Sequence, residues 1–159
     1  MDADNQQERL EAQWIVGFVD GEGSFLISIN KNEKMTLGWQ VLPEFRVVQH
    51  QNDEQILYKI KDYFGFGNVV VNHGDRKEFR VRGSENIKKI ISFFKENNLR
   101  TSKSKDFEIF CDVVGLMEDG QHLDKQGLLE IASLASNINN KIDRVSRILR
   151  DYTPNTHEV

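Results

Sequence analysis

The chain has 159 residues, of which 38% are hydrophobic and 29% are charged, and its formal net charge is −4. This composition suits a single domain, which we assign to residues 1–159, or one protomer of an obligate dimer. No apolar run reaches membrane-spanning length, and the acidic start is unlike a targeting peptide, so we expect no membrane partner and no targeting signal. The single cysteine, Cys111, excludes an intrachain disulfide and a zinc cluster.

The charged residues are unevenly distributed along the chain. Between Ser24 and Lys105 there are 15 Lys and Arg residues against 9 Asp and Glu residues, whereas the flanking parts are acidic. A basic middle with acidic flanks fits a protein that binds a polyanion on one face. Charges scattered over an ordinary surface explain the same counts about as well, so charge alone does not decide the partner.

The first helix is expected to start near Asn5 or Gln6, where Asn5 and Glu8 form a capping pair. It should run to about Asp20. The following Gly21 is an ordinary left-handed residue at which a helix can end.

The end of this helix combines small residues with acidic ones. Gly17 and Gly21 lie four residues apart, which leaves one helix face almost free of side chains and lets a second helix approach closely. Asp20 and Glu22 follow at the C-terminus, where the helix macrodipole is already negative. Two carboxylates at that position become favourable if a cation binds there.

The next elements alternate between strands and helices. Residues 24–30 and 39–49 alternate apolar with polar side chains, which predicts two half-buried strands, the second with a bulge or local edge at Pro43. A helix is expected over residues 53–64, ended by Gly65, and a helix capped by Ser84 is expected to end at Asn97. The remaining expected elements are strands at 67–72 and 77–82 and a helix at 101–116. They are followed by a helix through Leu128, Ile131, Ala132 and Ala135 and a last helix that carries Ile142, Val145 and Leu149.

This order predicts an α+β fold, in which four antiparallel strands form a sheet with helices on one face. The other face should carry the polar and basic side chains of Ser28, Asn30, Gln40, Arg46, Arg80 and Arg82. Such side chains can read base edges in the major groove, where arginine suits guanine and glutamine suits adenine. The alternative is the solvated polar face of any one-sided antiparallel sheet.

The stretch from Ile15 to Gly23, IVGFVDGEG, resembles the nine-residue motif of the LAGLIDADG homing endonucleases, and Ser24-Phe25 opens a strand after it, as is typical of that family. The expected element order agrees with the family as well. The resemblance implies the αββαββα homing-endonuclease fold with a saddle-like sheet. It assigns residues 1–23 to a dimer-interface helix with the catalytic acid, 24–105 to a DNA-binding sheet region and 106–150 to C-terminal helices.

The function that the resemblance implies is hydrolysis of both strands of a long double-stranded DNA site, which promotes mobility of the host intron. Because only one copy of the motif is present, two chains are expected to pair through Gly17 and Gly21 as a homodimer. A two-fold dimer reads two equivalent half-sites, so the site should be nearly palindromic. The alternative is an RNA-splicing maturase or a non-cutting DNA-binding protein on the same scaffold.

By the same resemblance, Glu22 is the catalytic acid and metal ligand, with the backbone carbonyl of Gly21 beside it. Glu22 stands where the family more often has Asp, and it keeps the charge. Mg²⁺ is the implied cofactor, since it prefers hard oxygen ligands, and other divalent cations are expected to substitute for it. Asp20 matches the first acid of the motif and is expected to be structural.

Two further catalytic residues follow from the resemblance. Gln49, at the end of the second predicted strand, matches a residue that orders active-site water, with a solvated glutamine as the alternative. Lys103 matches a lysine whose charge can stabilise the phosphate, and Lys105 is the competing choice. Near Asp53 some relatives have a basic residue, so either His50 or another residue takes that role here or the role is absent.

Most relatives of this kind are encoded in introns of organelle or archaeal genes. The compartment is therefore left open between a mitochondrion or chloroplast and a prokaryotic or archaeal cytoplasm.

Overall fold

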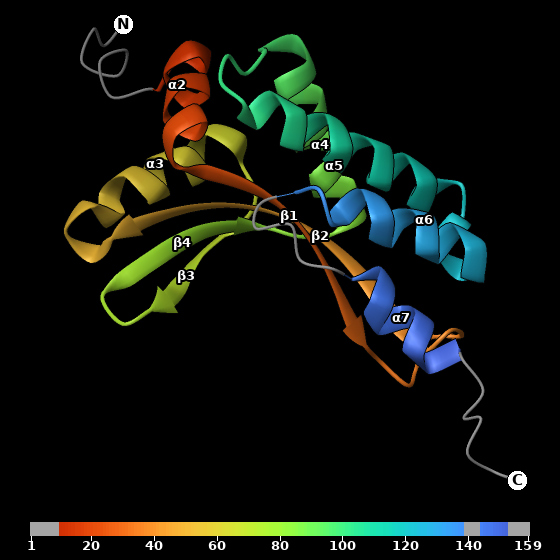
Figure 1. The fold of residues 1–159 in the computed structure, drawn as a ribbon. Coiled ribbons are helices and arrows are strands. Elements are labelled where there is room, and N and C mark those ends of the chain that lie inside the picture. The colour runs from red at the N-terminus through yellow and green to blue at the C-terminus, as the bar shows by residue number, and fades with distance from the viewer. Residues whose placement is uncertain (1–9, 139–143, 153–159) are drawn as a thin grey trace, which may run out of the picture.

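The structure is a computed structural model that describes residues 10–138 and 144–152. Its elements follow the predicted order of helix, two strands, helix, two strands and then helices (Figure 1). They are α2 (Ala12–Glu22), β1 (Gly23–Lys31), β2 (Trp39–His50), η1 (Gln51–Asp53), α3 (Glu54–Phe64), β3 (Asn68–His73), β4 (Arg76–Val81), α4 (Ser84–Glu96), α5 (Lys103–Glu118), η2 (Gln121–Leu123), α6 (Lys125–Ala135) and α7 (Val145–Tyr152).

The four strands form one antiparallel sheet in the order β1-β2-β4-β3. Helices α2 to α6 lie on one side of this curved sheet, and the opposite face is left uncovered (Figure 1). Helix α7 lies beside the far end of the β1–β2 hairpin (Figure 1). The predicted α+β architecture, with helices on one face of a four-stranded antiparallel sheet, is therefore confirmed. None of the helices in the described part of the chain has the length and hydrophobicity that crossing a membrane needs.

Phenylalanines fill the space between the sheet and the helices. The alternating pattern of the strands places Phe25, Phe45 and Phe79 toward the helices, and all three are fully buried. The ring of Phe25 lies 5.3 Å from that of Phe45 and 5.6 Å from that of Phe94 on α4, measured between centroids. Close aromatic packing of this kind fixes the distance between the sheet and the helix layer.

Helix α2 differs from the prediction at both ends. It begins at Ala12, after an extended Glu11, and the predicted capping pair Asn5–Glu8 lies outside the described residues. It continues through Gly21 to Glu22, so Gly21 does not end the helix in a left-handed conformation as predicted. The chain instead passes directly into β1 at Gly23, which has extended backbone angles.

Gly23 is the glycine that this junction requires. A Cβ atom there would lie 2.6 Å from the Cγ1 atom of Val19 and 3.0 Å from its carbonyl oxygen, too close for any side chain to fit without a shift of the backbone. The Gly23 N–H donates a hydrogen bond to the same carbonyl oxygen. The junction therefore holds β1 directly below the end of α2.

Of the smaller expectations, the one for Pro43 is confirmed and the one for Ser84 is wrong. Pro43 causes no bulge, because the pairing of β1 with β2 is regular through Pro43; it lies beyond the segment of β2 that pairs with β4, so the predicted local edge is correct. Ser84 is the first helical residue of α4 and not its cap, and its side chain makes no capping hydrogen bond. Gly65 ends α3 in the left-handed conformation, as predicted.

Candidate functional site

Glu22 is the last residue of α2, and its side chain is exposed. Within the described residues its carboxylate accepts no hydrogen bond and makes no ion pair. Gly21, whose backbone carbonyl is the second predicted metal ligand, is exposed beside it. Carboxylate and carbonyl oxygens are hard donors of the kind that Mg²⁺ prefers, so these residues fit the implied cation.

The carboxylate of Asp20 binds the loop between α4 and α5. It accepts hydrogen bonds from the backbone N–H groups of Arg100 (2.9 Å) and Thr101 (3.2 Å) and from the Thr101 hydroxyl (2.8 Å). Burial raises the pKa of Asp20, but the hydrogen bonds from Arg100 and Thr101 outweigh it and leave the pKa below its usual value. These bonds join α2 to a loop 80 residues away, as the predicted structural role of Asp20 requires.

Replacing Asp20 with Asn is expected to lower the free energy of unfolding by about 1.5–3 kcal/mol, because hydrogen bonds to a charged acceptor are lost or weakened. Since the folded pKa is lowered, this contribution is present above the unfolded value of 3.8 and is lost as the pH falls through the folded value. Urea unfolding at pH 7 and near pH 3, at constant protein concentration and in EDTA, measures both effects.

The exposed Asp62 on α3 provides the control for this prediction. The substitution Asp62→Asn removes the same charge and is expected to change stability by less than about 0.5 kcal/mol. If both variants unfolded alike at pH 7, Asp20 would have no special structural role.

Lys103 is the first residue of α5 and reaches the end of α2. Its Nζ atom donates a hydrogen bond to the backbone carbonyl of Gly23, next to Glu22. Burial lowers the pKa of Lys103, although nearby carboxylates, including that of Glu22, oppose this shift. Lys105 is exposed and has no such contact in the described part of the chain, so the geometry favours Lys103 over Lys105.

Gln49 lies at the same end of the sheet as Glu22. In the antiparallel register, Gly23 is paired with Val47, so Gln49 lies two residues beyond the last pair of β1 and β2. This register places Gln49 at the end of β2, next to the start of β1 where α2 ends. The three predicted catalytic residues, Glu22, Gln49 and Lys103, thus lie on three different elements that meet at one end of the sheet.

His50 does not supply a free basic group near Asp53. Its Nδ1 atom accepts a hydrogen bond from the backbone N–H of Asn52, at 3.1 Å, which leaves the proton on Nε2. Nε2 lies 2.8 Å from an Oδ atom of Asp75. The side chain therefore holds the turn between β3 and β4 against the end of β2.

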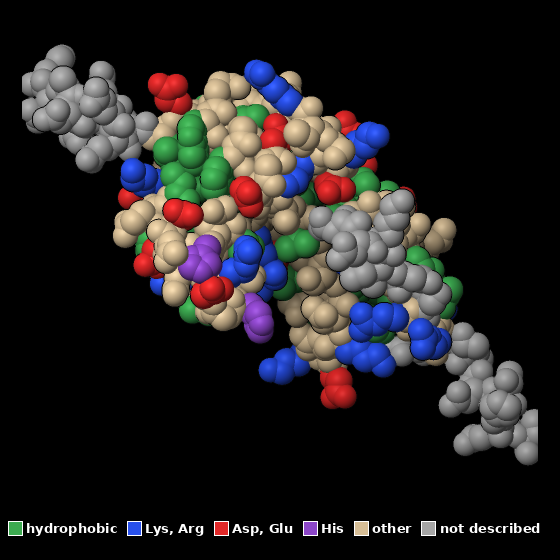
Figure 2. All heavy atoms as spheres, turned by 60° about the vertical axis from the view of Figure 1, so that its left-hand side comes forward, with side chains coloured by type: hydrophobic (Ala, Val, Ile, Leu, Met, Phe, Trp, Pro, Cys, Tyr) green, Lys and Arg blue, Asp and Glu red, His purple; other side chains and the backbone are tan. Residues whose placement is uncertain are grey.

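The outer face of α2 is open and apolar. Apart from the neighbouring backbone of α2 itself, no atom of the described residues lies within 4 Å of the position that a Cβ would take at Gly17 or Gly21. Trp14 is 40% exposed and stacks on Phe18, with 4.8 Å between ring centroids. Figure 2 shows the hydrophobic side chains gathered over this part of the molecule. Trp14, Gly17, Phe18 and Gly21 form one helical stripe, which we call the α2 face.

The uncovered face of the sheet carries the residues predicted to contact DNA. Ser28 and Asn30 lie on β1, Gln40 and Arg46 on β2, and Arg80 on β4, with Arg82 directly after it. Asn30 is paired with Gln40, and Arg46 with Arg80, across neighbouring strands. The structure thus brings all six predicted residues to the same face.

The prediction of a polar and basic sheet face did not take account of two acidic residues on that face. Glu44 and Glu78 occupy outward positions of β2 and β4, yet they are only 1% and 3% exposed. The arginine side chains cover them, so the face is less basic than the predicted residues alone indicate. Their positions in the alternating pattern were visible in the sequence, but their pairing with arginine was not.

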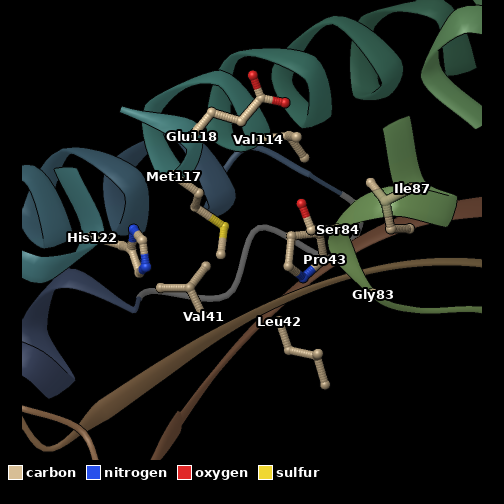
Figure 3. Close-up of a pocket in the computed structure, with 10 residues that line it drawn as sticks. All are labelled: Val41, Leu42, Pro43, Gly83, Ser84, Ile87, Val114, Met117, Glu118 and His122. Carbon is tan, nitrogen blue, oxygen red and sulfur yellow. The ribbon is translucent and has the colours of Figure 1, made fainter. Parts of the chain in front are cut away.

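Other chemical groups lie away from the end of the sheet where Glu22, Gln49 and Lys103 meet. A pocket of about 280 Å³ lies between β2, the start of α4, the end of α5 and η2, and none of the predicted catalytic residues lines it (Figure 3). Met117 and His122 face Val41 across it, whereas Leu42 points to the other side of the strand (Figure 3). Burial raises the pKa of the Cys111 thiol to about 11, which makes it a poor nucleophile at neutral pH.

Comparison with known proteins identifies the family. A family model described as "LAGLIDADG endonuclease" matches residues 15–114. A Neurospora crassa protein named "Probable intron-encoded endonuclease 2" is 34% identical over 133 residues, which are 82% of this chain and 29% of that protein. The chain therefore spans less than a third of this relative. The DNA endonuclease I-CvuI of Chlorella vulgaris is 26% identical, over 76% of this chain and 88% of its own length.

Solved structures agree with this assignment. The homing endonuclease I-TnaI superposes with a TM-score of 0.87 and 43% identity, covering 91% of this chain and 99% of that chain. The LAGLIDADG homing endonuclease I-SmaMI bound to cleaved DNA gives a TM-score of 0.84 and 32% identity, covering 92% of this chain and 50% of that chain. With the motif helix, the sheet and the matched family in agreement, the chain belongs to the LAGLIDADG homing endonuclease family.

Proposed function

We propose that two copies of this chain form a homodimer that hydrolyses both strands of a long, nearly palindromic DNA site in a reaction that requires Mg²⁺ or a similar divalent cation. The observation that carries this proposal is the exposed carboxylate of Glu22 at the end of α2, which has no partner among the described residues, with Lys103 close to it. The three arginines on the uncovered sheet face give the protein a means of binding DNA.

The proposed chemistry assigns one task to each residue. A bound divalent cation supplies a nucleophilic water and stabilises charge on the phosphate. The Glu22 carboxylate and the Gly21 carbonyl would hold the cation. The Gln49 amide orients water by hydrogen bonding, and the Lys103 ammonium stabilises negative charge that develops on the phosphate.

The dimer is proposed because one protomer does not complete such a site. Among the described residues there is no group of three or more His, Cys, Asp or Glu side chains that could hold a metal ion. Pairing two α2 faces would bring together two copies of Glu22, and DNA phosphates and waters would provide the other ligands. The match covers 50% of the I-SmaMI chain, so two copies of this chain would have about the combined length of one I-SmaMI chain.

A cleavage selection tests the proposed function and identifies the target site at the same time. The purified protein is incubated with a plasmid library that carries a randomised insert, with Mg²⁺ or with EDTA, and the linear products are sequenced. We expect linear products only with Mg²⁺ and one enriched, nearly palindromic sequence. Absence of any cleaved sequence would refute the endonuclease, and protein-dependent splicing of the host intron without cleavage would support the maturase alternative.

The intron-encoded relatives give a second way to define the target. One relative is described as a protein in ND4 intron 1 of Podospora anserina. If this chain is also encoded in an intron, the joined flanking exons should contain the sequence that the library selection enriches. That comparison would also identify the genome, and hence the compartment, in which the protein acts.

Lys103→Met is expected to lower the cleavage rate by about 10²-fold, because a charge that stabilises the developing phosphate charge is lost. Lys103→Arg should keep a larger part of the rate. Initial rates on the selected target, measured at saturating protein, report the effect on the chemical step. Lys105→Met removes the same charge two residues away and should remain within a few-fold of the wild type; an equal loss in the two methionine variants would contradict the assignment to Lys103.

A further inference from the structure

The uncovered sheet face contains a network of three arginines and two buried glutamates. By the alternation along β2 and β4, Glu44 and Glu78 lie on the side of the sheet away from the helices, where a glutamate ordinarily extends into water. A buried carboxylate is costly unless it is paired and hydrogen-bonded. Here Arg46, Arg80 and Arg82 provide the pairing, so the five side chains form one unit, which we call the sheet-face network.

Glu44 is at the centre of this network and holds two guanidinium groups. Its Oε2 atom lies 2.7 Å from Nε and 2.5 Å from Nη2 of Arg46. Its Oε1 atom lies 2.8 Å from Nε and 2.7 Å from Nη2 of Arg82, which is 38 residues away in the chain. Arg46 and Arg82 thus both bind Glu44 through the Nε–Nη2 edge of the guanidinium group. The Nη1 amino group of each arginine takes no part in this contact.

Glu78 supports the same arrangement from the neighbouring strand. Its Oε2 atom lies 3.3 Å from Nε of Arg46, and its Oε1 atom lies 3.7 Å from Nη1 of Arg80. Arg46 therefore lies between two carboxylates. The arginine side chains keep 27–43% of their surface exposed, so the paired groups remain accessible from the uncovered side.

This arrangement suits base recognition better than phosphate binding. A phosphate contact positions the protein but carries no direct sequence information, and any accessible cation can make it. Guanine recognition requires two parallel N–H groups aimed at O6 and N7. An arginine with free rotamers loses conformational entropy when it adopts that orientation, whereas an arginine already held by a carboxylate loses less.

The carboxylates also weaken attraction to DNA in general. Two negative charges among three positive ones leave the network with a net charge of about +1, and non-specific affinity depends on the positive charge that meets the phosphates. An acid that merely repelled DNA would lower affinity for every sequence equally. An acid that orients arginine lowers general affinity but increases the preference for the correct base.

We propose that Glu44 is a positioning residue that holds Arg46 and Arg82 with their outer edges fixed for guanine, and that it thereby sets the base specificity of the sheet face. This inference rests on the proposed function, because it requires that the sheet face bind DNA. Glu78 adds a second carboxylate beside Arg46 and Arg80, and its Oε2 atom accepts no hydrogen bond within the described residues. Glu44 itself acts through the arginines and needs no contact with DNA.

Binding selection on a randomised duplex DNA library, in EDTA so that no cleavage occurs, tests this role. The wild type, Glu44→Gln and Glu44→Asp are compared for two quantities: the affinity for random duplex at several salt concentrations, and the ratio of affinities for selected and random duplex. Glu44→Gln should bind random duplex a few-fold more tightly, with a steeper salt dependence, and its affinity ratio should fall about tenfold at guanine positions. Glu44→Asp keeps the charge but is too short to hold both arginines, so its ratio should fall without a gain in general affinity.

The control is Glu96→Gln, which removes an exposed carboxylate at the end of α4, on the helix side of the sheet. Its affinity ratio should equal that of the wild type. An unchanged ratio in Glu44→Gln and Glu44→Asp would overturn the positioning role and leave Glu44 as a repulsive charge. A parallel loss of affinity for random and selected duplex, with a lowered melting temperature, would overturn it in favour of a folding role. A wild type that enriches no sequence would refute the proposed function itself.

Discussion

Replacing Glu22 with Gln is expected to reduce DNA cleavage by about 10²–10³-fold or more, with DNA affinity nearly unchanged. Glutamine has the same length as glutamate but no charge, so a divalent cation at the end of α2 loses a charged oxygen ligand. Within the described residues the Glu22 carboxylate makes no hydrogen bond or ion pair, so its loss should not destabilise the fold. Initial rates of plasmid linearisation at fixed Mg²⁺, together with binding measured in EDTA, separate catalysis from recognition.

Two further variants serve as controls for the Glu22→Gln result. Glu22→Asp keeps the charge and restores the residue that is commoner in the LAGLIDADG motif, so it should retain most of the activity. Glu96→Gln removes an exposed carboxylate from α4 and should cleave at the wild-type rate. Wild-type cleavage by Glu22→Gln would show that the catalytic acid is another residue.

Replacing Gly21 with Leu is expected to convert the proposed homodimer into a monomer, with dimer affinity reduced at least about a hundredfold. Beyond the backbone of α2 itself, the Cβ position of Gly21 has no neighbour within 4 Å among the described residues, so a side chain can be added there. Leucine also favours a helix interior over glycine by roughly 0.5–1 kcal/mol. The same side chain would hold two α2 faces apart, because close helix contact depends on small residues. Sedimentation velocity over a range of concentrations measures the change.

Gly115 on α5 provides a matched control. It is also an exposed helical glycine with no neighbour within 4 Å of its Cβ position. Gly115→Leu should remain a dimer, and both leucine variants should be at least as stable as the wild-type protomer. A wild type that is monomeric both free and on DNA, or a Gly21→Leu variant that still dimerises, would contradict the assigned interface.

Much of the fold could be predicted because the signals for it are local. Alternation of apolar with polar residues places Phe25 and Phe45 on the buried side of their strands, whatever the rest of the chain does. Gly65 ends α3 because a left-handed residue is needed at that point in the chain. The same locality explains the errors at α2, since the sequence does not show that Gly21 stays helical and that the close contact with Val19 falls on Gly23.

The candidate site divides in the same way. By itself, the sequence determined that the stretch from Ile15 to Gly23 carries an acid next to its last glycine and is followed by a strand, and the resemblance of this stretch to the LAGLIDADG motif selected Glu22. Only the tertiary structure decided which distant groups meet that motif: Asp20 binds a loop, and Lys103 reaches Gly23, across a separation of 80 residues. It also decided that Glu44 holds Arg82, 38 residues away. Such pairs depend on strand register and on how helices pack, and these are properties of the whole fold that no short stretch of sequence contains.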